Sequence, residues 1–132
     1  PACGFLEVSR PRRYAEDVSL PKFMRMRIEA IARAYYPEAL YLENLANPLV
    51  VFEGDKIPAR ALPPFFIPVG SKDPIVPDSL RLSRALEERG VEHEYVVYPG
   101  EIHAFHAIYW SAMGKKCWKD HERFLKRYID FD

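Results

Sequence analysis

The feature of this sequence that most constrains its fold is an alternation of strand-like and helix-like segments within about 35 residues. Residues 65–70 form a run that is apolar on both faces, typical of a strand buried in a parallel sheet, although it contains Pro68 and proline favours sheet edges. Apolar residues then recur at helical spacing over 80–86 until Gly90, and an alternating segment follows at 91–97. This order predicts a βαβ unit with a right-handed crossover.

The remaining segments predict further elements around this unit. Residues 3–8 are short and apolar, as at the end of a strand, and the spacing over 21–36 predicts a helix that Pro37 ends. Residues 37–62 contain prolines and turn-forming residues, and predict irregular structure. A last amphipathic helix is predicted around 117–129. Four of its side chains are expected to face the sheet: Trp118, Phe124, Leu125 and Tyr128.

The loops that follow the two central strands carry a carboxylate and an imidazole. Asp73 follows the first strand and His103 follows the second. Open parallel sheets bind ligands beyond the carboxyl ends of their strands, and neighbouring strands lie about 5 Å apart, so these loops can meet. A carboxylate that orients an imidazole supplies the general base of a nucleophilic triad. Since an Asp and a His are common in loops, the pair alone does not establish this chemistry.

The residues around the pair resemble those of α/β-hydrolase esterases, most closely the hormone-sensitive-lipase-like group. Residues 62–78, LPPFFIPVGSKDPIVPD, resemble the acid-bearing segment of that group, and residues 82–91 resemble its helix and turn into the last strand. The sequence YPGEIHAF at 98–105 is similar to its histidine loop, with Ala104 where the family usually has glycine. The resemblance is closer over residues 62–130 than over the residues before them.

This resemblance implies a fold and an activity. The fold would be α/β, the C-terminal part of an α/β hydrolase, with a mainly parallel sheet and flanking helices. The activity would be hydrolysis of small-molecule carboxylic esters by a serine esterase or lipase, without a cofactor or metal. Asp73 is implied as the triad acid and His103 as the triad base, in the family's order of nucleophile, acid and histidine. Residues 15–61 would form a cap or insertion region.

The nucleophile of that family is missing from the sequence. These enzymes carry a serine in a G-x-S-x-G elbow and oxyanion donors in an upstream HGG-type loop. Here the serines, none of which has the flanking glycines, are residues 9, 19, 71, 79, 83 and 111. We therefore expect residues 1–132 to be the C-terminal portion of a hydrolase, inactive alone, whose N-terminal half lies upstream on the same or a separate chain. The alternative is a non-catalytic α/β-hydrolase-like binding or partner subunit.

Composition excludes several other classes of function. Nineteen basic residues balance nineteen acidic ones, so the positive surplus that nucleic acid or an anionic membrane surface would attract is absent. The longest nearly apolar run, residues 61–70, contains three prolines and is too short to span a membrane. The sequence begins without a signal-peptide pattern, which predicts a cytoplasmic protein if its natural N-terminus is not missing.

Other chemistry-bearing side chains have simpler interpretations. Cys3 precedes a glycine, as in cysteine-nucleophile relatives such as dienelactone hydrolases, but it lacks the first glycine of the elbow and is better explained as a buried thiol. Asp78 is a second carboxylate near the acid loop, in a place typical of a helix N-terminus. His106 would need Glu101 as well as His103 to hold a metal ion, so we assign no metal.

The remaining histidines and aromatic residues leave two interpretations open. His93 and His121 are interpreted as structural or solvated. Phe105, Tyr109 and Trp110 form an aromatic group that would either wall an acyl pocket or belong to the core.

Overall fold

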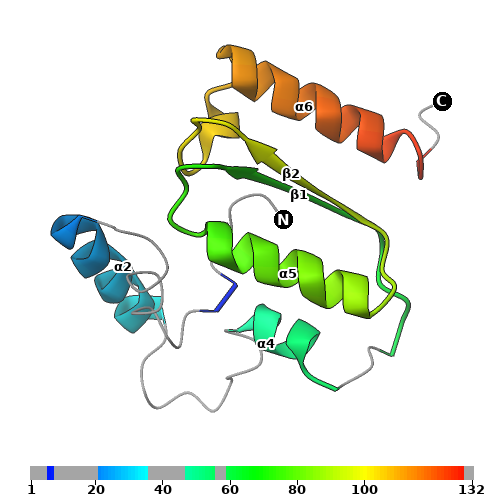
Figure 1. Ribbon diagram of the computed structural model, residues 1–132, viewed down its shortest axis with the longest axis horizontal. Helices are drawn as coiled ribbons and strands as arrows, with labels where there is room; N and C mark the ends of the chain where they lie inside the picture. The colour runs from blue at the N-terminus through cyan, green and yellow to red at the C-terminus, as the bar shows by residue number, and fades with distance from the viewer. Residues whose placement is uncertain (1–5, 8–20, 36–46, 56–58, 130–132) are drawn as a thin grey trace.

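The predicted βαβ unit is the centre of the structure (Figure 1). The computed structural model describes residues 6–7, 21–35, 47–55 and 59–129. In chain order its elements are helices α2 (Lys22–Tyr35) and α4 (Pro48–Glu53), strand β1 (Phe65–Gly70), helix α5 (Val76–Glu88), strand β2 (His93–Tyr98), the short 3₁₀ helix η1 (Phe105–Ala107) and helix α6 (Ala112–Leu125).

The two strands pair in parallel and end at the same level. Phe65 lies opposite His93 at the start of the ladder, and Gly70 lies opposite Tyr98 at its end. Helices α5 and α6 cover opposite faces of the strands, with α4 beyond α5 (Figure 1). Every residue of β1 after Phe65 is buried, which confirms the predicted strand. Because the strands end together, their two following loops leave from one edge of the sheet.

The face of the strands toward α5 carries the larger apolar cluster. Ile67 of β1 packs there with Leu82 and Leu86 of α5 and with Leu49 of α4, and each of these side chains is at most 1% exposed. Strand residues alternate between the two faces, so Tyr95, opposite Ile67 in the ladder, packs on the same cluster. This packing fixes α5 between the two strands that it connects.

The opposite face holds α6 through aromatic contacts. The ring of Phe66 lies 5.5 Å from the ring of Phe124 and stacks on His121 at the same distance. Nearer the carboxyl ends of the strands, Tyr98, Phe105 and Cys117 form a second buried cluster. His121 is therefore a structural residue, and Phe105 belongs to the core.

Helix α4 contradicts the prediction of irregular structure over residues 37–62. Pro48 stands in the first turn of α4, where a missing N–H costs nothing, and Gly54 follows its last residue. Leu49 is fully buried against α5, so tertiary packing stabilises a six-residue helix that local sequence signals do not favour.

Helix α6 begins five residues before its predicted start. The side chain of Ser111 caps the helix by accepting a hydrogen bond from the N–H of Gly114 at 2.9 Å. Phe124 faces the sheet as expected. The prediction was wrong for Trp118, which is 49% exposed; its indole donates a hydrogen bond to the carbonyl of His106.

Some predictions fall outside the described residues. Of the predicted strand at 3–8 only Leu6 and Glu7 are described, and Cys3 lies outside, as do the first residues of the predicted cap region. Helix α2 lies within that region and confirms the helix predicted over 21–36. Among its described side chains, the buried apolar ones are Ile28 and Ala32. Within the described part of the chain, no helix has the length and apolarity that crossing a membrane requires.

Candidate active site

Asp73 and His103 meet where the two strands end. The Nδ1 atom of His103 lies 3.1 Å from each carboxylate oxygen of Asp73. The side chain of Asp73 is fully buried, whereas that of His103 is 43% exposed. An ionised carboxylate only accepts hydrogen bonds, so Nδ1 carries the proton and donates it, which leaves Nε2 of the neutral ring free to accept one. The predicted contact is thus present, in the geometry of an orienting acid and a general base.

The backbone of its own loop holds Asp73. Its N–H donates to the carbonyl of Gly70 at 3.0 Å, and its Oδ1 accepts from the N–H of Ile75 at 2.9 Å. The second bond is an Asx turn, which explains why the short side chain of aspartate suits this position. The backbone therefore fixes the carboxylate independently of His103.

The acid loop and the histidine loop are bonded to each other. The N–H of Lys72 donates to the carbonyl of Glu101 at 2.8 Å, and the N–H of Gly100 donates to Oγ of Ser71 at 2.8 Å. At Gly70 the loops approach so closely that an added Cβ would lie 2.4 Å from the carbonyl oxygen of Glu101. Glycine at position 70 is therefore required for the two loops to lie together.

Ala104 adopts a backbone conformation that favours glycine. Its φ angle is 58°, in the left-handed region, and it stands immediately before η1. Residues other than glycine adopt this region at a cost of about 1–2 kcal/mol. The backbone thus keeps the conformation that a glycine would adopt freely, although alanine occupies the position.

The surroundings of His103 favour its protonated form. Its hydrogen bond with Asp73 raises the pKa above the ordinary 6.5, partial burial opposes this increase, and the negative charge of Asp73 adds to it. The pKa of His106 is lowered, first by burial and then by repulsion from His103. The two imidazoles are therefore electrostatically different, and the one bonded to the carboxylate is the stronger base.

The rival side chains have structural roles in the described part of the chain. The Oδ2 atom of buried Asp78, in the first turn of α5, accepts a hydrogen bond from the N–H of Leu6 at 3.1 Å. The ring of His106 lies edge-on to Phe105. The residues that the structure describes include no group of three or more His, Cys, Asp or Glu side chains placed to hold a metal ion.

A serine–histidine contact lies at the other end of the sheet. Oγ of Ser83 is 2.9 Å from Nε2 of His93, whose Nδ1 is 2.9 Å from the carbonyl of Val91. His93 is the first residue of β2, so this pair lies at the amino end of the strand, away from the loops that hold His103. It joins α5 to β2 and is interpreted as structural.

The aromatic group near His103 divides between core and surface. Phe105 is fully buried, whereas Tyr109 and Trp110 are each 67% exposed and pack edge-to-face at 5.0 Å. A groove of about 460 Å³ runs from the acid loop along the start of α5. Its lining residues are Ser71, Lys72, Asp73, Val76, Pro77, Leu80, Arg81 and Arg84, so it reaches the acid but not His103.

The match to a family model decides the family. The model of the alpha/beta hydrolase fold matches residues 2–107, which is most of the chain and includes both loops. The chain belongs to the α/β-hydrolase family. The α/β-hydrolase fold predicted from the sequence is therefore confirmed, and the parallel pair of strands with its helices is consistent with part of such a fold.

Solved structures of esterases share the fold of this α/β hydrolase. An esterase/lipase from an uncultured bacterium matches with a TM-score of 0.72 and 20% identity, over 96% of this chain and 41% of that one. Esterase E25 matches with a TM-score of 0.76 and 19% identity, over 98% and 39%. EstE5, soaked with p-nitrophenyl butyrate, matches with a TM-score of 0.65 and 22% identity, over 88% and 38%. The chain thus spans about two fifths of the length of each.

The resemblance to esterases that the motifs predicted is confirmed by these neighbours. No curated protein matches the chain significantly by sequence. This α/β hydrolase therefore has an esterase- or lipase-like fold.

Proposed function

We propose that this chain supplies the acid and the base of a carboxylic ester hydrolase of the serine type. The observation that carries the proposal is the contact between Nδ1 of His103 and the buried carboxylate of Asp73, at the carboxyl ends of two adjacent parallel strands. Ligands of such sheets bind at that edge. In this role His103 is the general base and Asp73 fixes its tautomer and stabilises the imidazolium that forms.

Each half of the reaction would use two proton transfers at Nε2 of His103. In the first, Nε2 takes the proton of a serine hydroxyl as its oxygen attacks the acyl carbon of the ester. In the second, the imidazolium gives this proton to the departing alkoxide, which leaves as the alcohol, and an acyl-enzyme remains. Water then attacks the acyl-enzyme by the same two transfers, releasing the acid and restoring the serine.

The serine and the oxyanion donors belong, in this proposal, to the N-terminal half of the hydrolase. That half either precedes residue 1 on the same chain or is a separate chain. Two facts support it: the sequence contains no G-x-S-x-G, and the solved esterases are more than twice as long as the segment matched. We call the polypeptide or complex that joins both halves the complete hydrolase. Residues 1–132 alone are expected to be inactive toward esters, because the missing parts supply most of the acceleration.

Active-site labelling tests the proposal against a non-catalytic α/β-hydrolase-like subunit. In the complete hydrolase, a sulfonyl fluoride should label one serine stoichiometrically, and peptide mapping should place it in a G-x-S-x-G segment before residue 1. The His103→Ala variant should lose this labelling, because the serine is then not activated. No labelled serine in the folded wild type, together with no hydrolysis of p-nitrophenyl butyrate, would favour the non-catalytic subunit.

A further inference from the structure

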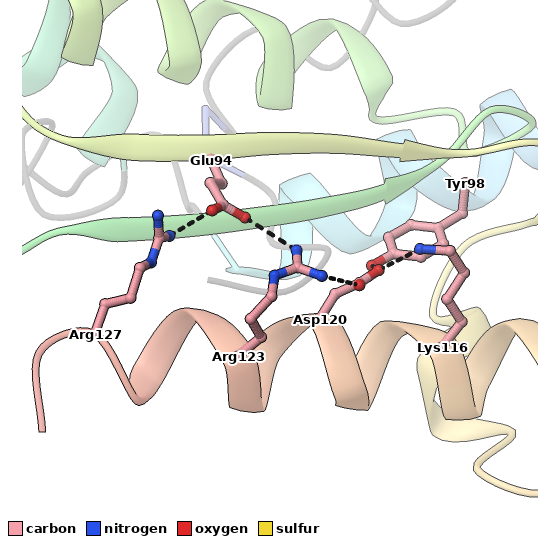
Figure 2. A network of polar contacts seen from close by, with 6 residues as sticks. All are labelled: Glu94, Tyr98, Lys116, Asp120, Arg123 and Arg127. Atoms are coloured by element: carbon pink, nitrogen blue, oxygen red, sulfur yellow. Dashed lines mark hydrogen bonds and ion pairs between the residues drawn. The ribbon is translucent and has the colours of Figure 1, made fainter. Parts of the chain in front are cut away.

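Behind the histidine loop, a buried tyrosine is bonded to a buried carboxylate. Tyr98, the last residue of β2, is 1% exposed, and its hydroxyl donates to Oδ2 of Asp120 on α6 at 2.8 Å. Asp120 is 6% exposed, and its carboxylate also binds Lys116 at 2.6 Å and Arg123 at 2.8 Å. Figure 2 shows these side chains converging on Asp120 between α6 and the end of β2.

Tyr98 also contacts both loops of the candidate site. Its carbonyl accepts a hydrogen bond from the N–H of Ser71 at 2.9 Å and one from the N–H of Glu101 at 3.4 Å. Its ring centroid lies 4.8 Å from that of Phe105, which is fully buried two residues after His103. A displacement of Tyr98 would therefore shift both the acid loop and the histidine loop, because both contact it.

The hydroxyl of Tyr98 is a permanent donor to Asp120. Burial raises the pKa of Tyr98 far above its ordinary value, and the hydrogen bond with Asp120 raises it further. Burial alone would raise the pKa of Asp120, but hydrogen bonds from Lys116, Tyr98 and Arg123 outweigh it and lower the pKa. The hydrogen bond therefore joins a neutral phenol to an ionised carboxylate at neutral pH, and such charge-assisted bonds are strong.

We propose that Asp120 is a positioning residue for ester hydrolysis, acting through Tyr98 and Phe105 on the placement of His103. This inference rests on the proposed function. Asp120 accepts a hydrogen bond from the hydroxyl of Tyr98 and so holds the tyrosine ring in place. That ring packs on Phe105, which anchors the loop that carries His103. Catalytic groups must be held closely, since a misplacement of about 1 Å costs on the order of 10²-fold in rate.

Three variants of the complete hydrolase test this role with p-nitrophenyl butyrate. Tyr98→Phe removes the hydroxyl and leaves Asp120 paired with Lys116 and Arg123; Asp120→Ala removes the acceptor. Each should lower kcat by about tenfold with little change in KM, because transition-state geometry rather than substrate binding is affected. Asp120→Asn keeps an oxygen that accepts from Tyr98 and should retain kcat to within about twofold.

Two readouts distinguish positioning from general destabilisation. The acidic limb of the kcat/KM profile should move to lower pH in Tyr98→Phe and Asp120→Ala, since a looser contact with Asp73 raises the pKa of His103 less. The double variant Tyr98→Phe/Asp120→Ala should be no slower than Asp120→Ala, as expected of residues that act as a unit. The control is Glu122→Gln, which breaks an exposed ion pair between α6 and its C-cap residue Lys126 and should leave kcat and the pH profile unchanged.

The outcomes separate this inference from the proposed function. If His103→Ala is inactive while Tyr98→Phe has wild-type kcat and pH profile, the positioning role is overturned and the proposed function stands. If Asp120→Asn is as slow as Asp120→Ala, the ion pairs rather than the hydrogen bond from Tyr98 matter, and the inference also fails. Should Asp120→Ala not fold, Tyr98→Phe decides. Full activity of His103→Ala would overturn both.

Discussion

Asp73 and His103 are held by different means. Asp73 is fixed by two backbone hydrogen bonds within its own loop and is fully buried. The ring of His103 is bonded to Asp73 and remains 43% exposed, as a base that must reach a substrate requires. The sequence allowed both residues to be predicted, because each lies in a loop that follows a strand and the residues around them resemble those of esterases. The strained backbone of Ala104 was not predicted, since φ depends on how the loop closes onto Phe105.

The raised pKa of His103 predicts a pH dependence. The pKa of the imidazole should lie above 6.5 in the folded wild type and fall in Asp73→Asn, as followed by NMR titration of the ring. Since the folded pKa exceeds the unfolded one, the stability that the contact contributes is fully present below about pH 6.5 and is lost as the pH rises through the folded pKa. Hydrolysis needs neutral His103, so kcat/KM should rise over that same range. An unchanged pKa in Asp73→Asn would contradict the contact.

Ala104→Gly should stabilise the protein. The left-handed conformation costs alanine about 1–2 kcal/mol, and glycine avoids this cost. Glycine also has more conformational freedom in the unfolded chain, which lowers the gain in stability by about 0.5–1 kcal/mol. The net gain should be about 0.5–1 kcal/mol in the free energy of unfolding, measured by denaturant titration. Ala107→Gly is the control, because Ala107 lies in η1 without a positive φ. This substitution should lower the free energy of unfolding. A loss of stability in Ala104→Gly would show that its backbone is not strained.

At the scale of elements, the strands and α5 follow from local patterns, whereas α4 and the orientation of Trp118 do not. A continuous apolar run predicts β1 because helices cover both faces of that strand. An alternating pattern predicts β2, which is less completely buried. Helix α4 exists because Leu49 is buried against α5, a contact between segments that no local pattern reveals. The bond between Tyr98 and Asp120 likewise joins residues 22 positions apart, so sequence analysis missed it.

Gly70→Ala should disrupt the junction between β1 and the histidine loop. The added Cβ would lie 2.4 Å from the carbonyl oxygen of Glu101, which is backbone and cannot turn aside. Overpacking of this kind typically costs about 1–3 kcal/mol, and we expect the upper end of that range. The free energy of unfolding and kcat should both fall.

Gly90→Ala is the matched control for that substitution. Gly90 has a φ angle of 63° but nothing within 4 Å of an added Cβ, so only the backbone cost of about 1 kcal/mol applies. Gly90 also lies between α5 and the amino end of β2, away from the loops that hold Asp73 and His103, so kcat should be retained. Equal losses of stability and activity in the two variants would argue against a close approach of the loops at Gly70.

At the scale of the whole molecule, the chain spans about two fifths of the length of the solved esterases that share its fold. Family membership and the shared fold of solved esterases agree with the parallel pair of strands and its flanking helices. The proposed acid, Asp73, and the proposed base, His103, lie on this chain, and the proposed nucleophile does not. The missing G-x-S-x-G predicts this division, because a triad is assembled from separate loops of one sheet. The sequence did not predict which aromatic residues after His103 belong to the core: Phe105 is buried, whereas Tyr109 and Trp110 are exposed.

The most direct test of the central claim is the rate of p-nitrophenyl butyrate hydrolysis by the complete hydrolase and its variants at the acid and the base. We expect His103→Ala to lose nearly all turnover with little change in Tm, because its side chain is partly exposed in a loop. Asp73→Asn should lower kcat on the order of 10⁴-fold, as a wrong tautomer does. Near-normal kcat in either variant, with the protein folded, would contradict the assignment of Asp73 and His103 and make Asp78 the next acid to test.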